Sequence, residues 1–159
     1  MRIRSAAFEN DAPIPVRHTC DGEDISPALR FEDIPDGAAS LALIVDDPDA
    51  PAKVWVHWLL WGLPADMVEL PEDVPKTRIV EGLGGLRQGT TDFDRVGYGG
   101  PCPPPGHGTH HYRFTLHALD RRIDLDAGAT REELERRLKG RVLAEARLVG
   151  TYARWTRDP

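Results

Sequence analysis

The sequence is short of the residues and motifs that would assign it at once to a well-defined class. It has only 2 cysteines in 159 residues, Cys20 and Cys102, and they form neither a C-x-x-C pair nor a disulfide-rich scaffold. We therefore expect two free thiols in a reducing, cytoplasmic environment. A chain of this length can bury a core without disulfides, so we expect a single domain over residues 1–159.

Long apolar runs and a basic surplus are also missing. No stretch approaches the roughly 20 apolar residues of a membrane span, and residues 1–10 lack the apolar centre of a secretion signal. The net charge is -6, and no basic patch with interleaved aromatic residues occurs. These absences argue against a membrane span and against a nucleic-acid partner.

The common nucleotide-binding and hydrolase motifs are absent as well. The glycine cluster at residues 82–85 does not complete G-x-G-x-x-G, and no P-loop, G-x-S-x-G or H-E-x-x-H sequence is present. We therefore expect no cofactor and no bound metal.

Three apolar segments predict a mainly β protein. Leu41–Val45 is a short apolar run between turn formers, which favours a strand buried on both faces. Val54–Leu63 is the longest apolar run and is rich in valine and tryptophan, which is typical of a central strand. Tyr112–Leu119 also has strand composition.

One segment, Ala129–Gly140, predicts a helix. Thr130 and Glu133 form a capping box, and Gly140 stands where a C-terminal cap is expected. We expect residues 142–146 to continue helically and Leu148–Arg154 to return to a strand.

The stretch Gly97–Tyr112 reads G-Y-G-G-P-C-P-P-P-G-H-G-T-H-H-Y and is the first candidate for function. Its glycines and prolines exclude a helix and favour a stiff, extended loop. Because side chains alternate along a strand, His110 and Tyr112 share one face if pairing begins by His110, and His111 lies on the other.

A second candidate lies around Asp47 and Asp49, which flank Pro48 after the first buried run. In an extended backbone both carboxylates project to the same side, although D-P-D is also a common turn. His57 follows among large apolar side chains, where taken alone it is typical of a core histidine with one satisfied hydrogen bond.

Taken together, these motifs resemble the phosphatidylethanolamine-binding protein family, which includes the Raf kinase inhibitor proteins. The resemblance rests on D-D-P-D-A-P, then V-H-W, then G-Y-G-G-P-C-P-P-P-G followed by H-H-Y-R-F-T-L-H-A-L-D. It points to the bacterial and archaeal Raf kinase inhibitor-like branch. The segments T-C-D-G-E-D-I-S-P, Q-G-T-T-D-F and L-V-G-T-Y-A-R extend it over nearly the whole chain.

The resemblance implies a mainly β fold of antiparallel sheets packed face to face, with one or two short peripheral helices. His111, where the family usually has arginine, and His117, where an aromatic residue is common, depart from its pattern. Carried over position by position, the ligand pocket that it implies consists of Asp47, Asp49, Pro51, His57, Gly100, His110 and Tyr112.

Such a pocket suits a small anion. His110, Tyr112 and glycine N–H groups can donate to a phosphate or carboxylate, while the aspartates can orient a histidine or meet a ligand ammonium group. We expect a non-catalytic binding protein for a phosphorylated small molecule or a phosphoethanolamine-like phospholipid headgroup. Regulation or inhibition of a protein partner, such as a kinase or serine protease, and formation of a homodimer are further hypotheses.

Two enzymatic hypotheses compete with that of a non-catalytic binding protein. A metal-dependent hydrolase would use carboxylate and imidazole ligands. A cysteine hydrolase would use Cys102, but the prolines on either side of it supply no oxyanion N–H. The ligands available to the metal-dependent enzyme are Asp47, Asp49, His57, His107 and His110.

Overall fold

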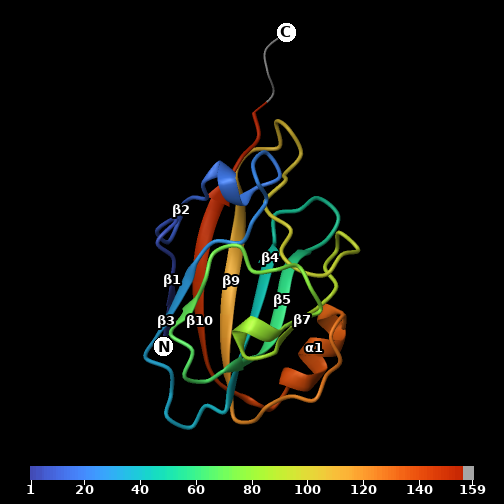
Figure 1. Ribbon diagram of the computed structural model, residues 1–159. Helices are drawn as coiled ribbons and strands as arrows, with labels where there is room; N and C mark the ends of the chain where they lie inside the picture. Colours follow the sequence, from blue (N-terminus) through green and yellow to red (C-terminus); the bar gives the residue numbers. More distant parts are fainter. Residues whose placement is uncertain (156–159) are drawn as a thin grey trace.

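The computed structural model describes residues 1–155 and contains two β-sheets. The larger sheet has the order β2 (Ala12–Pro13), β10 (Val142–Tyr152), β9 (His110–Leu119), β4 (Ser40–Asp47), β5 (Trp55–Pro64), β8 (Leu86–Gln88) and β7 (Ile79–Val80). The smaller has the order β1 (Arg2–Arg4), β3 (Leu29–Glu32) and β6 (Glu69–Leu70). The helical elements are η1 (Val16–His18), η2 (Glu81–Leu83) and α1 (Arg131–Leu138) (Figure 1).

The large sheet is covered on both faces, which is why its central strands are almost wholly apolar. On one face, Leu41, Leu43 and Val45 of β4 share a core with residues of the small sheet. On the other, Ala42 and Ile44 pack in a second core with α1. Every residue of β4 is buried, as the continuous apolar run predicts. The expected mainly β fold of packed sheets with a peripheral helix is confirmed.

The helix prediction is confirmed in position and in its cap. Thr130 is the N-cap, and its hydroxyl accepts a hydrogen bond from the Glu133 N–H at 3.4 Å. Leu134 and Leu138 are buried against the sheet. Gly140, just beyond the helix, has a φ of 76°, which turns the chain out of the helical path.

The expected helical continuation over residues 142–146 is wrong. Residues 142–152 form the strand β10, which pairs antiparallel with β9 from Val142 opposite Leu119 to Tyr152 opposite His110, with a register shift between Val142 and Ala144. Backbone hydrogen bonds and cross-strand side-chain contacts over ten residue pairs outweigh the weak local helix propensity of this stretch.

The prediction of free thiols is also wrong, because a disulfide joins Cys20 to Cys102. A separation of 82 residues in sequence does not describe distance in space, and the two loops meet at one end of the large sheet. The disulfide contradicts the expectation of two free thiols in a reducing environment. No helix in residues 1–155 has both the length and the apolar character needed to cross a bilayer.

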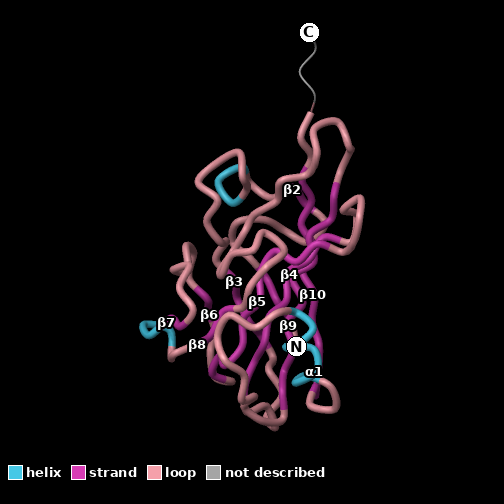
Figure 2. Tube along the Cα trace, turned by 90° about the vertical axis from the view of Figure 1, so that its right-hand side faces the viewer, coloured by secondary structure: helices cyan, strands magenta, loops and turns pink. Residues whose placement is uncertain are grey.

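The antiparallel topology gathers four chain segments at that same end. β4 finishes there at Asp47, β5 begins there opposite it at Trp55, and β9 begins at His110 opposite the last residue of β10. The loop after β4 and the loop before β9 lie at this end of the sheet, as does η1, whereas α1 packs against the face of the large sheet that is turned away from the small sheet (Figures 1 and 2). Residues that are far apart in sequence therefore meet around one place.

Reduction of the Cys20–Cys102 bond is expected to lower the free energy of unfolding by roughly 2–5 kcal/mol, because a long closed loop restricts the unfolded chain. Guanidinium unfolding with and without dithiothreitol measures the difference. A variant carrying Cys20→Ser and Cys102→Ser is the control, since its lower stability should not respond to reductant. Equal stability of the unmodified protein under both conditions would contradict the prediction.

Candidate functional site

A cavity of about 240 Å³ opens where these segments meet. Larger hollows exist on the surface, but this one brings together most of the residues that the sequence motifs single out. Five of the seven predicted site residues line it, namely Asp47, Pro51, His57, His110 and Tyr112. The remaining wall is formed by Ala50, Trp55, Phe93, Cys102, Pro103 and Pro104.

Asp47 and His110 form a buried pair at the base of the cavity. The Nδ1 of His110 lies 2.6 Å from Oδ2 of Asp47, and both side chains are almost fully buried. Because an ionised carboxylate only accepts hydrogen bonds, His110 carries a proton on Nδ1 and donates it. The second Asp47 oxygen accepts the backbone N–H of Asp49 at 2.8 Å, which fixes the carboxylate as the turn after β4 begins.

His107 extends this pair toward the surface. Its Nδ1 lies 2.6 Å from Nε2 of His110, so a single proton is shared between the two rings. The glycines on either side of His107, both at positive φ, allow the loop to fold its side chain back onto the site. The resulting series of groups, Asp47–His110–His107, holds the His110 ring in one orientation.

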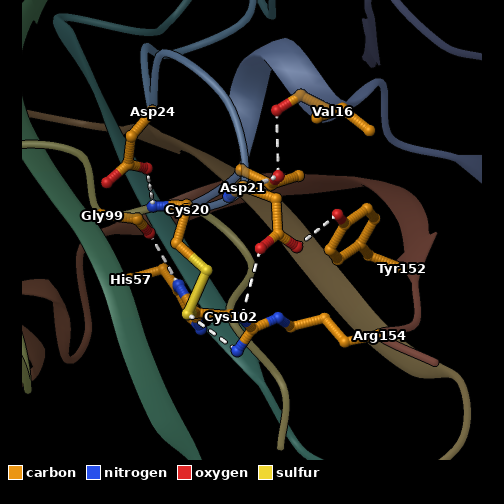
Figure 3. Close-up of a disulfide and its surroundings, with 11 residues drawn as sticks. Val16, Cys20, Asp21, Asp24, His57, Gly99, Cys102, Tyr152 and Arg154 are labelled. Atoms are coloured by element: carbon orange, nitrogen blue, oxygen red, sulfur yellow. Dashed lines mark hydrogen bonds and ion pairs between the residues drawn. A yellow bond between two sulfur atoms is a disulfide. The ribbon is translucent and has the colours of Figure 1, made fainter. Parts of the chain in front are cut away.

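His57 is buried in the cavity wall with one ring nitrogen satisfied. Its Nδ1 donates to the backbone carbonyl of Gly99 at 2.6 Å (Figure 3). The ring meets Phe93 and Tyr112 edge-on, at centroid distances of 5.2 and 5.1 Å. Burial lowers the pKa of His57 below its ordinary value, although the Asp47 carboxylate raises it. The imidazole is therefore neutral at physiological pH.

Two buried polar atoms beside the cavity have no hydrogen-bond partner among the described residues. They are the hydroxyl oxygen of Tyr112 and the indole Nε1 of Trp55. Burial, together with the nearby Asp47 and Asp49 carboxylates, raises the pKa of the Tyr112 phenol far above its ordinary value, so it stays protonated. Both groups are therefore available as hydrogen-bond donors.

Sequence reasoning missed Trp55 as a site residue. The signal was present, because Trp55 stands two positions before His57 in the same strand and alternation places both on one face. The apolar composition of the strand concealed this role, because a tryptophan in an apolar strand is typical of a hydrophobic core.

Asp49 and Gly100 are not part of the cavity wall. Asp49 turns toward solvent, where Oδ2 accepts from the backbone N–H and from Nδ1 of His111 at 2.8 and 2.7 Å. Partial burial raises the pKa of the Asp49 carboxyl, but the bonds from His111 outweigh this and lower it. The N–H of Gly100 donates to Oδ1 of Asp24 at 2.7 Å, which ties the glycine loop to the η1 segment.

A cross-linked wall closes one side of the cavity (Figure 3). Cys102 lines the cavity and is bonded to Cys20. Asp21, next to Cys20, accepts hydrogen bonds from the Tyr152 hydroxyl at 2.6 Å and pairs with Arg154 at 3.2 Å. Arg154 also reaches the Cys102 sulfur at 3.8 Å. Because Cys102 is held in a disulfide, it presents no thiolate for a cysteine hydrolase.

The geometry does not assemble the ligands of the hydrolase alternative. Residues 1–155 contain no group of three or more histidine, cysteine, aspartate or glutamate side chains placed to hold a metal ion. Asp49 is directed away from His57, and His107 is directed at another imidazole. Nothing in the arrangement supports metal-assisted hydrolysis.

Comparison with known proteins agrees with the fold. Residues 4–153 match the family model described as phosphatidylethanolamine-binding protein. A UPF0098 protein of Pyrococcus abyssi is 49% identical over 94% of this chain and 84% of its own length. LppC of Mycobacterium tuberculosis, which carries a lipoprotein name, is 41% identical over 96% of this chain and 72% of its own.

Two solved structures have the same fold at closely similar length. CT736 of Chlamydia trachomatis, described as a homolog of phosphatidylethanolamine-binding protein, superposes with a TM-score of 0.85 at 35% identity over 99% of this chain and 97% of its own. YbcL of Escherichia coli, described as a new member of the mammalian family, gives 0.86 at 31% identity over 96% and 97%. This chain belongs to the phosphatidylethanolamine-binding protein family, in its bacterial and archaeal branch.

Proposed function

We propose that the cavity binds a small oxyanion, best matched by phosphate or a phosphorylated headgroup such as phosphoethanolamine, and that the protein is not an enzyme. One observation carries the proposal: the Tyr112 hydroxyl and the Trp55 indole N–H are buried beside His110 without partners among residues 1–155. A buried unsatisfied donor costs about 1–3 kcal/mol, so these groups disfavour the folded protein on its own. An oxyanion that accepts from both removes that cost.

The walls strengthen such a bond. Apolar side chains surround the donors and exclude water, which lowers the local dielectric and makes each charge-assisted hydrogen bond stronger. These side chains belong to Pro51, Phe93, Pro103 and Pro104. The volume of about 240 Å³ is at the small end for ligand pockets, which typically hold roughly 300–1,000 Å³, and suits a headgroup rather than a whole lipid.

Asp49 and Gly100 support the proposed pocket without lining it. The backbone N–H of Asp49 holds one oxygen of Asp47, and the N–H of Gly100 holds the glycine loop against Asp24. Asp47 itself offers negative charge to the ammonium group of a ligand such as phosphoethanolamine. The family description, which names phosphatidylethanolamine, supports this ligand class.

Regulation of a protein partner stays a separate prediction. A carboxypeptidase Y inhibitor solved with its cognate proteinase shares the fold, with a TM-score of 0.54 at 15% identity. That likeness extends to the fold alone. Inhibition of a kinase or serine protease, a homodimer, a single domain and a cytoplasmic location are predictions that these observations leave open to test.

Replacement of Tyr112 by phenylalanine is expected to stabilise the ligand-free protein and weaken anion binding. Removing the unpaired hydroxyl should raise the free energy of unfolding by about 1 kcal/mol, because the buried donor has no partner. Loss of its bond to the anion should weaken phosphate binding by about 10-fold. Guanidinium unfolding and isothermal titration calorimetry measure the two effects.

Tyr98→Phe is the matched control, because the buried Tyr98 hydroxyl donates to the backbone carbonyl of His18 at 2.7 Å. This change should lower the free energy of unfolding by roughly 1–3 kcal/mol and leave phosphate binding unaltered. If Tyr112→Phe binds phosphate as tightly as the unmodified protein, the Tyr112 hydroxyl is not a ligand donor.

His110→Ala is expected to weaken binding of phosphate and phosphoethanolamine by about 10-fold to 100-fold, because loss of the ring leaves the buried Asp47 carboxylate without its partner beside the bound anion. His111→Ala is its control, because that ring is half exposed and bonded to Asp49 outside the cavity. Titration calorimetry should show near-normal binding in the control. Equal losses in both variants, or no loss in His110→Ala, would place the anion elsewhere.

A further inference from the structure

His57 contributes something to the cavity that the other polar groups do not. A backbone carbonyl can only accept a hydrogen bond, so the 2.6 Å contact between Nδ1 of His57 and Gly99 O places a proton on Nδ1. The residue is 3% exposed, and burial lowers its pKa although the carboxylates of Asp47, Asp24 and Asp46 oppose the shift. The ring therefore carries one proton, and that proton is on Nδ1.

The other ring nitrogen consequently presents a lone pair. His57 lines the cavity, and no residue among 1–155 donates a hydrogen bond to its Nε2. The neighbouring Tyr112 and Phe93 rings meet the imidazole edge-on at centroid distances beyond 5 Å, and the Tyr112 hydroxyl makes no hydrogen bond to it. An acceptor thus lies beside the Tyr112 and Trp55 donors in one small cavity.

We propose that His57 makes the pocket selective for oxyanions that bring a hydrogen-bond donor of their own. A phosphomonoester monoanion has a P–O–H group, and phosphoethanolamine adds an ammonium group. Sulfate and simple phosphodiesters have only acceptor oxygens, so an acceptor oxygen of the bound anion would face the lone pair of Nε2. The inference rests on the proposed anion binding and names the ligand class within it.

The physical basis is the difference between an acceptor that receives a hydrogen bond from the ligand and one that faces another acceptor within the small cavity. A binding site built to hydrogen-bond a ligand hydroxyl rejects an analogue without it, because the site's own polar group is left unpaired on binding. The neighbouring apolar side chains of Phe93, Pro103 and Pro104 limit the water that could otherwise bridge two acceptors. The pocket therefore discriminates between oxyanions by whether they carry a hydrogen-bond donor, and not by their net charge.

Methyl phosphate and dimethyl phosphate provide the test, by isothermal titration calorimetry at about pH 5, after nitrogen-15 NMR of the unmodified protein has established that Nε2 of His57 is unprotonated at that pH. A protonated Nε2 there would overturn the inference. The second pKa of a phosphomonoester is about 6, so at this pH both probes carry close to one negative charge. Methyl phosphate should bind about 10-fold to 100-fold more tightly than dimethyl phosphate. This ratio corresponds to the one hydrogen bond to Nε2 of His57 that methyl phosphate makes and dimethyl phosphate cannot make. Sulfate, with more charge and no proton, should bind no better than dimethyl phosphate.

His57→Gln separates this effect from the extra methyl group of dimethyl phosphate. The glutamine side chain ends in an N–H₂ group that can donate to an acceptor oxygen. In the variant, dimethyl phosphate should gain affinity and the ratio between the two probes should fall toward one, whereas a purely steric effect would leave the ratio unchanged. Trp55→Phe is the control, and should weaken both probes by similar factors.

If the unmodified protein binds both probes equally, or if His57→Gln folds and keeps the ratio, the selectivity inference is overturned while anion binding stands. If neither probe nor phosphate binds, the proposed function itself fails. Should His57→Gln not fold, nitrogen-15 NMR of the unmodified protein decides. Methyl phosphate should shift the Nε2 resonance of His57 and dimethyl phosphate should not, and equal shifts would contradict the inference.

Discussion

The antiparallel pairing of β4 with β9 is the constraint on which the rest of the structure depends. It places the end of one strand beside the start of the other, so that Asp47 meets His110 at 2.6 Å. The residue before Asp47 points to the opposite face, where Asp46 is buried between the guanidinium groups of Arg113, at 2.7 and 2.9 Å, and Arg131, at 2.9 Å. Two adjacent aspartates are thus neutralised by different partners on the two faces of one sheet. One of these pairs ties α1 to the sheet, and the other forms the base of the cavity.

The two indoles that are buried away from the site have hydrogen-bond partners, unlike the indole in the site. The buried Trp58 indole donates to Gln88 at 2.7 Å and Trp61 to Leu125 O at 3.1 Å, whereas Trp55 and Tyr112 beside the cavity have no partner among the described residues. Buried donors without partners disfavour the folded state unless a ligand supplies the acceptor. The same groups therefore link stability to binding, which is the usual relation between a functional site and the fold that carries it.

The cavity is assembled from loops, yet its position is fixed by many contacts. The disulfide joins the η1 segment to the proline-rich loop, and the pair of Asp21 with Arg154 adds the end of β10 to the same wall. Gly100 and Tyr98 make further bonds to that segment, at 2.7 Å each. A loop held at several points loses little conformational entropy when a ligand binds, which favours affinity from a small contact area.

The sequence by itself determined what depends on local periodicity and local capping. The apolar run of β4, the helix capped by Thr130 and the opposite directions of His110 and His111 follow from rules that act over a few residues. Five of the seven site residues predicted from the family motifs line the cavity. Only the tertiary structure decided which distant groups meet. The Cys20–Cys102 bond, the turn of Asp49 toward His111 and the unpaired Trp55 N–H each depend on the spatial approach of separate segments. Residues 142–146 show the same limit, because pairing with β9 imposed a strand where the local sequence favoured a helix.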